Sequence, residues 1–317
     1  MLLVFLFACT ALSVPEEEEV LPFEMEATLR PVPSAGVGSR GVWFWSSEGS
    51  PYGSLNIVGD TAAESATLAA FDAWGIGLVR GAYGDLPSTA PLLVAAWNVR
   101  LHNTGRLSEL LLSGSSWVYP DLRADLWERV DRCLVSFQPS VEAAGRFDAL
   151  HVDIEPQALA EWDSEDLAGN RERLSLLLDT LQETRQYLDD HGLADVPLLA
   201  DVPVWWDDLP PSLGARGSVG WESVEDRDAW FDGLFSTVSG VTLMAYDRPV
   251  FSDIALGVDW EWDHYPGQVR VGLEVDIPDT WPDLDGWRAA AEAVEEVYGP
   301  GAGSDIQSWE LIMGNGG

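Results

Sequence analysis

Short apolar runs alternate with amphipathic stretches along the chain from about residue 37 onward. Eight runs have the length and the β-branched or aromatic content of strands: 42–45, 77–82, 107–113, 147–155, 196–203, 241–247, 269–275 and 306–311. Helical spacing of apolar residues is clear over 121–137, 167–191, 221–235 and 284–298. Alternating strands and helices indicate an α/β protein with a parallel sheet, and eight strands close a barrel. The pattern predicts a single-domain (β/α)8 TIM barrel over 37–317.

The strand at 147–155 carries acidic side chains on one face. Alternate residues of a strand share a face, so three aliphatic residues point one way while His151, Asp153 and Glu155 point the other. Two neighbouring carboxylates repel each other and lose hydration, which raises the pKa of one and leaves a proton donor beside an anion. Glycosidases use such pairs. The alternative is a solvated pair of acids where the strand enters a loop.

Other strands bring polar and aromatic residues to the same end of the predicted barrel. The same period of two, applied to each strand, gives the inward or strand-end residues Trp43, Trp45, Asp201, Tyr246, Asp247, Arg270 and Glu274. In TIM barrels the active site lies at the carboxyl ends of the strands. We therefore expect these residues to surround one site together with Asp153 and Glu155.

Two of the predicted strands resemble those of glycoside hydrolase family 18, the chitinase-type enzymes. Residues 148–155, Asp-Ala-Leu-His-Val-Asp-Ile-Glu, are similar to the signature Asp-x-x-Asp-x-Asp-x-Glu on the fourth barrel strand of that family. Residues 244–247, Met-Ala-Tyr-Asp, are similar to its Met-x-Tyr-Asp on the sixth strand. The resemblance covers the predicted barrel, although only these short motifs are specific, and it implies a divergent chitinase-like glycosidase.

The resemblance implies a role for each matching residue. Glu155 would be the general acid and later the general base, and Asp153 would orient and stabilise an N-acetyl group of the substrate. Tyr246 and Asp247 would hold that acetamido group, and Trp309 would form the floor of the sugar site. Because the acetamido oxygen acts as the nucleophile, such substrate-assisted retention needs no nucleophile from the enzyme.

The chain departs from the family pattern at His151, which stands where the family has its middle aspartate. That aspartate normally helps to move the proton of the next acid, so the resemblance implies altered pH behaviour or different chemistry here. One reading gives His151 a role in substrate binding or catalysis. The other makes it an interior histidine hydrogen-bonded to Asp153.

A second mechanism uses Glu274, which ends the strand at 269–275. Many retaining barrel glycosidases place an acid/base on one strand end and a carboxylate nucleophile on another, about 5 Å apart. Glu155 and Glu274 would fill these roles. Those enzymes usually have Asn before the acid/base, whereas Ile154 precedes Glu155 here. The alternative for Glu274 is an ion pair with Arg270.

Composition narrows the class of partner. The formal charge of −36 and the pI near 4.1 repel phosphate backbones and anionic lipid head groups, which argues against nucleic-acid binding. Sixteen tryptophans offer indole faces that suit sugar rings as well as core packing. Besides the glycosidase, we therefore consider a catalytically inactive barrel that binds glycans through Trp43, Trp45, Trp117, Trp205, Trp206 and Trp309. His151 and Asp201 would contact substrate in the glycosidase.

The N-terminal segment predicts export. Residues 1–14 are apolar but too short to span a bilayer, and Leu-Phe-Ala-Cys at 6–9 resembles a lipobox in which Cys9 would be lipidated. Residues 15–36 form an acidic, Pro- and Glu-rich linker. We expect a bacterial protein that is periplasmic, anchored to the envelope or extracellular, and monomeric. Besides Cys9 only Cys133 remains, so no internal disulfide is expected.

No metal or cofactor site is predicted. His102, His151, His191 and His264 are dispersed and show no metal-ligand spacing. The glycines at 36–41 precede a strand instead of following one, so they do not form a dinucleotide loop. The sequence therefore favours cofactor-free hydrolysis of a neutral or N-acetylated polysaccharide.

Overall fold

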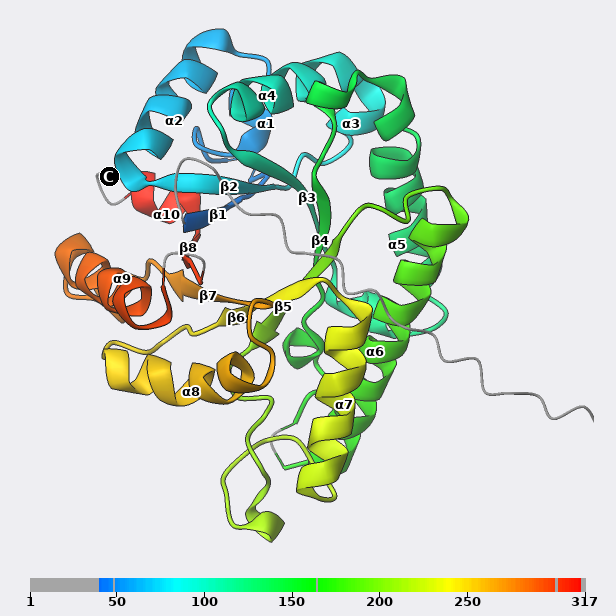
Figure 1. Ribbon diagram of the computed structural model, residues 1–317, viewed down its shortest axis with the longest axis vertical. Helices are drawn as coiled ribbons and strands as arrows, with labels where there is room; N and C mark the ends of the chain where they lie inside the picture. The colour runs from blue at the N-terminus through cyan, green and yellow to red at the C-terminus, as the bar shows by residue number, and fades with distance from the viewer. Residues whose placement is uncertain (1–39, 48, 164, 300–301, 315–317) are drawn as a thin grey trace, which may run out of the picture.

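The computed structural model describes residues 40–47, 49–163, 165–299 and 302–314, and these form a closed, parallel, eight-stranded barrel (Figure 1). The strands are β1 Arg40–Phe44, β2 Ile76–Gly81, β3 Leu107–Ser113, β4 Ala149–Asp153, β5 Leu198–Pro203, β6 Gly240–Met244, β7 Val269–Glu274 and β8 Ser304–Gln307. Each strand pairs with the next in chain order, and Val42 opposite Ile306 closes the ring. The predicted (β/α)8 barrel is confirmed.

Helices surround the strands (Figure 1). They are α1 Ser54–Ile57, α2 Thr61–Trp74, α3 Leu86–Thr89, α4 Pro91–Asn103, α5 Arg123–Val130, α6 Leu167–Asp190, α7 Val224–Thr237, α8 Phe251–His264, α9 Leu284–Tyr298 and α10 Trp309–Gly314. Short helical turns are η1 Ser115–Val118, η2 Asp131–Val135, η3 Gln138–Ser140, η4 Ala143–Gly145, η5 Pro156–Ala158 and η6 Pro211–Leu213. The turns and strand–helix loops position the residues discussed below.

Side-chain hydrogen bonds define where several helices begin. Asp60 accepts from the backbone N–H groups of Ala62 and Ala63 at the start of α2. Ser223 and Asp283 cap α7 and α9 in the same way. Such caps satisfy backbone donors that lack a partner inside the helix and contribute about 1 kcal/mol each.

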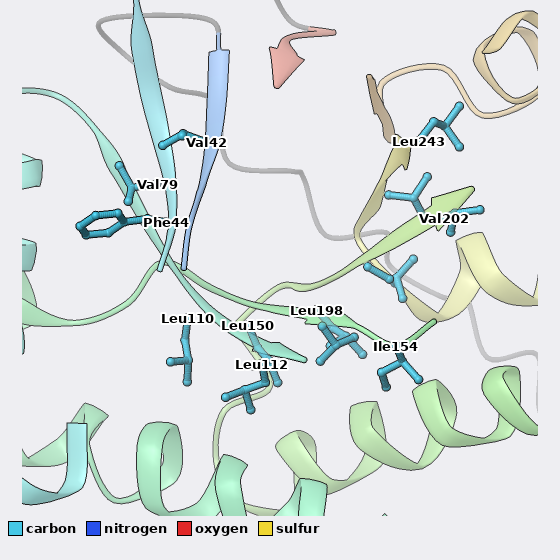
Figure 2. Close-up of a cluster of buried hydrophobic side chains, with 14 of the residues drawn as sticks. Val42, Phe44, Val79, Leu110, Leu112, Leu150, Ile154, Leu198, Val202 and Leu243 are labelled. Carbon is cyan, nitrogen blue, oxygen red and sulfur yellow. The ribbon is translucent and has the colours of Figure 1, made fainter. Parts of the chain in front are cut away.

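The outward faces of the strands form the main core. Their aliphatic side chains, among them Leu110, Leu150 and Leu198, are almost fully buried and point toward the surrounding helices (Figure 2). Burying such a side chain contributes about 1.5–3 kcal/mol. Because the apolar residues face outward, the alternate residues of each strand face the inside of the barrel, which is where the candidate site lies.

The ends of three predicted strands are wrong. The strand expected over 241–247 ends at Met244, so Tyr246 and Asp247 lie in the loop after β6. The run 306–311 was expected to be a strand, but β8 ends at Gln307 and α10 begins at Trp309. A short apolar run lacks a clear period, so packing decides between helix and strand. Strand β4 ends at Asp153, which places Glu155 in the following loop instead of on the strand itself.

The N-terminal predictions lie outside the described residues. They concern the signal segment 1–14, the linker 15–36 and the lipidation of Cys9, and they remain predictions. Within the described ranges, the structure contains no helix that is both long enough and apolar enough to cross a membrane.

Candidate active site

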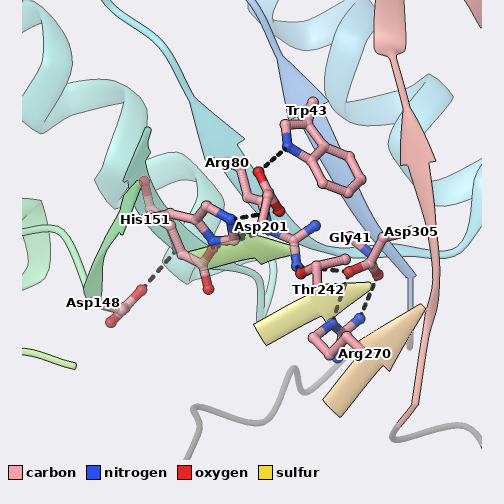
Figure 3. A network of polar contacts seen from close by, with 11 residues as sticks. Gly41, Trp43, Arg80, Asp148, His151, Asp201, Thr242, Arg270 and Asp305 are labelled. Carbon is pink, nitrogen blue, oxygen red and sulfur yellow. Dashed lines mark hydrogen bonds and ion pairs between the residues drawn. The ribbon is translucent and has the colours of Figure 1, made fainter. Parts of the chain in front are cut away.

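Charged side chains of both signs fill the inside of the barrel (Figure 3). The cations are Arg80, Arg270 and His151, and the anions are Glu109, Asp201 and Asp305. Arg80 forms ion pairs with Asp305 (2.6 Å) and Glu109 (3.3 Å), and Arg270 forms one with Asp305 (2.6 Å). Two guanidinium groups hold the pKa of Asp305 well below its usual range, although burial by itself would raise it. With three cations and three anions, this network carries no net charge.

His151 lies in the middle of this network. Its Nε2 is 2.9 Å from Asp201 Oδ1, and its Nδ1 is 3.1 Å from Glu109 Oε2. Burial would lower the pKa of His151, but the charge of Asp201 and the hydrogen bonds to Asp201 and Glu109 outweigh it and raise the pKa to about 9. The imidazolium therefore donates from both nitrogens, so the nearby Nε of Arg80 does not donate to Nδ1. The partners of His151 are thus Asp201 and Glu109, whereas the sequence suggested Asp153.

The charge on His151 predicts a pH-dependent stability. Folding raises its pKa from 6.5 to about 9, so its contribution is complete below pH 6.5 and is lost as the pH rises through 9. We expect the difference in free energy of unfolding between the wild type and His151→Gln to shrink by about 3 kcal/mol between pH 6 and pH 10. Urea unfolding at both pH values measures it. A pH-independent difference would contradict the assignment.

Asp201 is held from two sides inside the barrel (Figure 3). Trp43 Nε1 donates to Asp201 Oδ2 at 3.0 Å, while His151 binds the other oxygen. The Trp43 ring lies so close to Gly272 that a Cβ there would come within 2.8 Å of it. Trp43 and Asp201 are 1% and 2% exposed, so both were rightly expected to face inward, but they contact protein groups below the mouth.

Asp153 and Glu155 lie at the carboxyl end of β4, at the mouth of the barrel. Asp153 is 5% exposed, and its Oδ1 has no hydrogen-bond partner in the described part of the chain. Burial and the charges of Asp201 and Glu155 raise the pKa of Asp153 to about 8. Burial and the charge of Asp201 also raise the pKa of Glu155, whose Oε2 accepts from Gln157 Nε2 at 2.6 Å. Both carboxyls thus tend to keep a proton.

Tyr246 follows β6 and shares this environment. Its pKa is raised well above 10 by burial and by the charges of Asp201, Asp153, Glu155 and Glu274. The phenol therefore stays a hydrogen-bond donor at every physiological pH. The four carboxyl groups that raise the pKa of Tyr246 lie on β4, β5 and β7 or directly after them. Tyr246 therefore lies where these three sides of the mouth come together.

Asp247 follows β6 and Glu274 ends β7, two and three strands along the barrel from β4. Asp247 is exposed with a positive φ of 57°, and Thr280 Oγ1 lies 3.5 Å from its Oδ1. The pKa of Glu274 is raised by burial and then by the charges of Asp276 and Asp247. Arg270, considered as a partner of Glu274, forms its ion pair with Asp305 instead.

Four of the six tryptophans expected to bind glycans are buried, namely Trp43, Trp117, Trp206 and Trp309. Trp309 is 1% exposed, and its ring packs edge-on against Phe71 of α2 with centroids 4.7 Å apart. Trp117 is 5% exposed and lies over Gly114, where a Cβ would come within 2.6 Å of the indole. In these positions both rings contribute to packing between the strands and the helices.

Trp45 and Trp205 are partly exposed at the ends of β1 and β5. Trp205 forms an edge-to-face pair with Trp162, with centroids 5.8 Å apart. Sequence reasoning missed Trp162, because it lies in a loop where no periodicity marks it. The indoles of Trp162 and Trp205 offer apolar faces from the loops after β4 and β5, and the loop after β4 also carries Glu155.

Sequence reasoning also missed Arg80, Glu109, Asp305 and Gln157. A signal existed for the first two, because each is a lone charge inside an otherwise apolar predicted strand. Such a residue must face the barrel interior and find a partner there, since a buried unpaired charge is strongly unfavourable. Asp305 fell just before the predicted start of the last strand, at Ile306, so its inward position was not apparent.

The histidines other than His151 have local partners. His102 Nε2 is 2.9 Å from Asp148 Oδ2, and His191 and His264 each lie 2.7 Å from a backbone carbonyl four residues earlier. In the ranges that the structure describes, no three or more His, Cys, Asp or Glu side chains are arranged to hold a metal ion.

Comparison with known proteins finds likeness in structure only. No protein-family model matches the sequence, and no curated protein matches it either. The structure is similar to a family GH18 chitinase from Chromobacterium violaceum, with TM-score 0.53 and 11% identity over 89% of this chain and 82% of that one. It is also similar to the PgaB (BpsB) glycoside hydrolase domain from Bordetella bronchiseptica, with TM-score 0.53 and 12% identity over 90% of this chain and 96% of that one.

A third similar structure is the spore cortex-lytic enzyme SleL from Bacillus megaterium, with TM-score 0.50 and 11% identity over 90% of this chain and 75% of that one. At such identities the likeness establishes the fold. The predicted likeness to family 18 chitinases is therefore confirmed for the barrel, and the low identity agrees with a divergent sequence.

Proposed function

We propose that this protein is a glycoside hydrolase that cleaves an N-acetylated or neutral polysaccharide, with Glu155 as general acid and base. The observation that carries the proposal is the meeting of Asp153, Glu155 and Tyr246 at the mouth of the barrel, where burial and mutual charge keep protons on all three. A general acid must hold its proton near the working pH, and a raised carboxyl pKa meets that need.

The arrangement suits a substrate-assisted, retaining reaction. Glu155 would protonate the departing sugar oxygen while the acetamido oxygen of the substrate attacks the anomeric carbon. Tyr246, a permanent donor, would bind the acetamido oxygen, and Asp153 would accept from the acetamido N–H once ionised. Water then opens the cyclic intermediate, with Glu155 as the base that takes its proton.

The two-carboxylate mechanism receives less support. A nucleophile about 5 Å from Glu155 would act strongly on its pKa. The charges that act on Glu155 come from Asp201, and those that act on Glu274 come from Asp276 and Asp247. Glu274 and Asp247 are therefore proposed to bind substrate at the β6–β7 side of the mouth.

The proposal extends to the rest of the site and to the cellular location. Trp45, Trp205 and Trp162 would bind sugar rings beside Glu155, because they are the partly exposed tryptophans on the loops after β1, β4 and β5. The similar structures that are chitinases and glycoside hydrolases agree with a carbohydrate ligand. Export, with or without a lipid on Cys9, is proposed from the N-terminal sequence.

An assay on paired aryl β-glycosides tests the reaction. We expect turnover of N-acetylglucosaminides and chito-oligosaccharides, no turnover of the matching glucosides, and slower turnover of N-trifluoroacetyl substrates, whose amide oxygen is a weaker nucleophile. Equal rates on glucosides would contradict substrate assistance and favour the two-carboxylate reaction. Binding of chito-oligosaccharides without any turnover would contradict the enzyme and favour a glycan-binding barrel.

A further inference from the structure

Two inward carboxyl groups lie next to each other on neighbouring strands. In the parallel pairing of β4 with β5, Val152 lies opposite Ala200. The next residue on each strand is Asp153 and Asp201, and both turn toward the barrel interior. Neighbouring strands are about 4.8 Å apart, so the two carboxyl groups cannot avoid each other's field.

The two groups differ sharply in their hydrogen bonds. Asp201 is 2% exposed and accepts from His151 Nε2 on one oxygen (2.9 Å) and from Trp43 Nε1 on the other (3.0 Å). Asp153 has one oxygen without a partner within the described residues, and its side-chain hydrogen bonds are to Ser113 and Glu155 at the mouth, not to a cation. Adjacent carboxylates share a proton, and the proton resides on the group whose ionised form is less stabilised.

We propose that Asp153 and Asp201 form an asymmetric carboxyl pair, in which Asp201 keeps the charge and Asp153 keeps the proton. Asp201 is then a positioning residue: it acts on the mouth through Asp153 and Glu155 without touching substrate. The catalytic consequence rests on the proposed function, whereas the pair itself does not. In the place where family 18 enzymes have an aspartate on the fourth strand, this chain has His151, and the neighbouring carboxylate comes from β5.

The charges around the pair support this distribution. The titratable or hydrogen-bonding groups that face the pair come from five strands or their ends and are Trp43, Arg80, Glu109, Ser113, His151, Glu155, Thr242 and Tyr246. The cations Arg80 and His151 both act on Asp201, and His151 also acts on Asp153, where its charge opposes the rise in pKa. On the other side, the charge of Asp201 raises the pKa of Asp153, Glu155 and Tyr246 together.

Carboxyl titration by NMR on the whole protein, without substrate, tests the pair. In the wild type we expect Asp153 to titrate near pH 8 and Asp153→Asn to abolish that signal, while Asp207, whose pKa burial and the charge of Asp208 raise to about 7, is assigned with Asp207→Asn. Asp201→Asn removes the neighbouring charge, so the titration of Asp153 should fall by about one pH unit or more. Trp43→Phe is the matched structural control: it removes a hydrogen bond from the same group but keeps its charge, so the titration should not fall.

The same variants then separate the pair from the reaction. If the enzyme is active, Asp201→Asn should move the alkaline limb of kcat/KM to lower pH by a similar amount, because Glu155 loses its proton sooner. A signal that survives Asp153→Asn, or equal shifts in Asp201→Asn and Trp43→Phe, would overturn the pair. If Asp201→Asn does not fold, the Asp153→Asn spectrum still tests whether the signal near pH 8 belongs to Asp153. If the protein hydrolyses none of the glycans, the proposed function is wrong, but the titration result still holds.

Discussion

Replacing Glu155 by glutamine is expected to lower turnover of an N-acetylated aryl glycoside by about 10²- to 10⁴-fold while leaving its binding nearly unchanged. Glutamine has the same shape and can still contact Gln157, which donates to Glu155 in the native protein. It cannot give a proton to the leaving oxygen. Activity with a good leaving group, such as a nitrophenolate, should suffer least, because that group departs without full protonation.

A control variant distinguishes loss of the acid from loss of local charge. Glu161→Gln makes the same chemical change at an exposed position of the same β4–α6 loop, and turnover should stay at the wild-type level. Initial rates and calorimetric binding of a chito-oligosaccharide measure the two effects separately. If Glu155→Gln keeps wild-type turnover, Glu155 is not the general acid and the proposed mechanism is wrong.

The second large effect is expected for Arg80→Met, which should lower the free energy of unfolding by about 3–5 kcal/mol. Arg80 is fully buried and forms ion pairs with Asp305 and Glu109, and its guanidinium lies 4.6 Å from the ring of Trp43. Methionine fills similar volume but leaves the anions inside the barrel in excess. Uncompensated buried charge, not lost contact area, dominates the loss.

Two further variants test that reasoning by urea denaturation. Arg288→Met removes an exposed arginine whose partner Asp285 is also exposed, so the loss should stay below about 1 kcal/mol. Adding Glu109→Gln to Arg80→Met restores the balance of charge, and part of the lost stability should return. Additive losses in the double variant would contradict a charge-balanced interior.

The charged interior also bears on the site. The inside of a TIM barrel is commonly filled by branched aliphatic residues, and buried ion pairs contribute little net stability compared with apolar packing. Here the ionic network reaches from Asp305 through Arg80, Glu109 and His151 to Asp201, which lies beside Asp153 on the neighbouring strand. The residues of this network thus fix an anion beside Asp153, which is the basis for assigning Asp201 a positioning role.

Sequence patterns predicted the barrel, and they predicted which residues of β1, β4 and β5 point toward its interior. The alternation in β4 placed His151 and Asp153 inward, and the aliphatic neighbours of Asp201 and Trp43 did the same for β5 and β1. The pattern failed at β8, where Trp309 begins a helix, and it did not mark Trp162. Short apolar runs and loop residues carry no period, so their positions follow from packing alone.

The sequence by itself determined the order of strands and helices, the inward faces of the strands and the acids at the end of β4, because these depend on periodicities of two and 3.6 residues within short segments. Only the tertiary structure decided which inward groups meet. Hydrogen bonds from His151 and Trp43 to Asp201 join three strands, and the burial of Trp117 and Trp309 depends on helices packed around them. The distances between side chains on different strands are set only when the barrel closes, and the pKa shifts that depend on those distances are set with them.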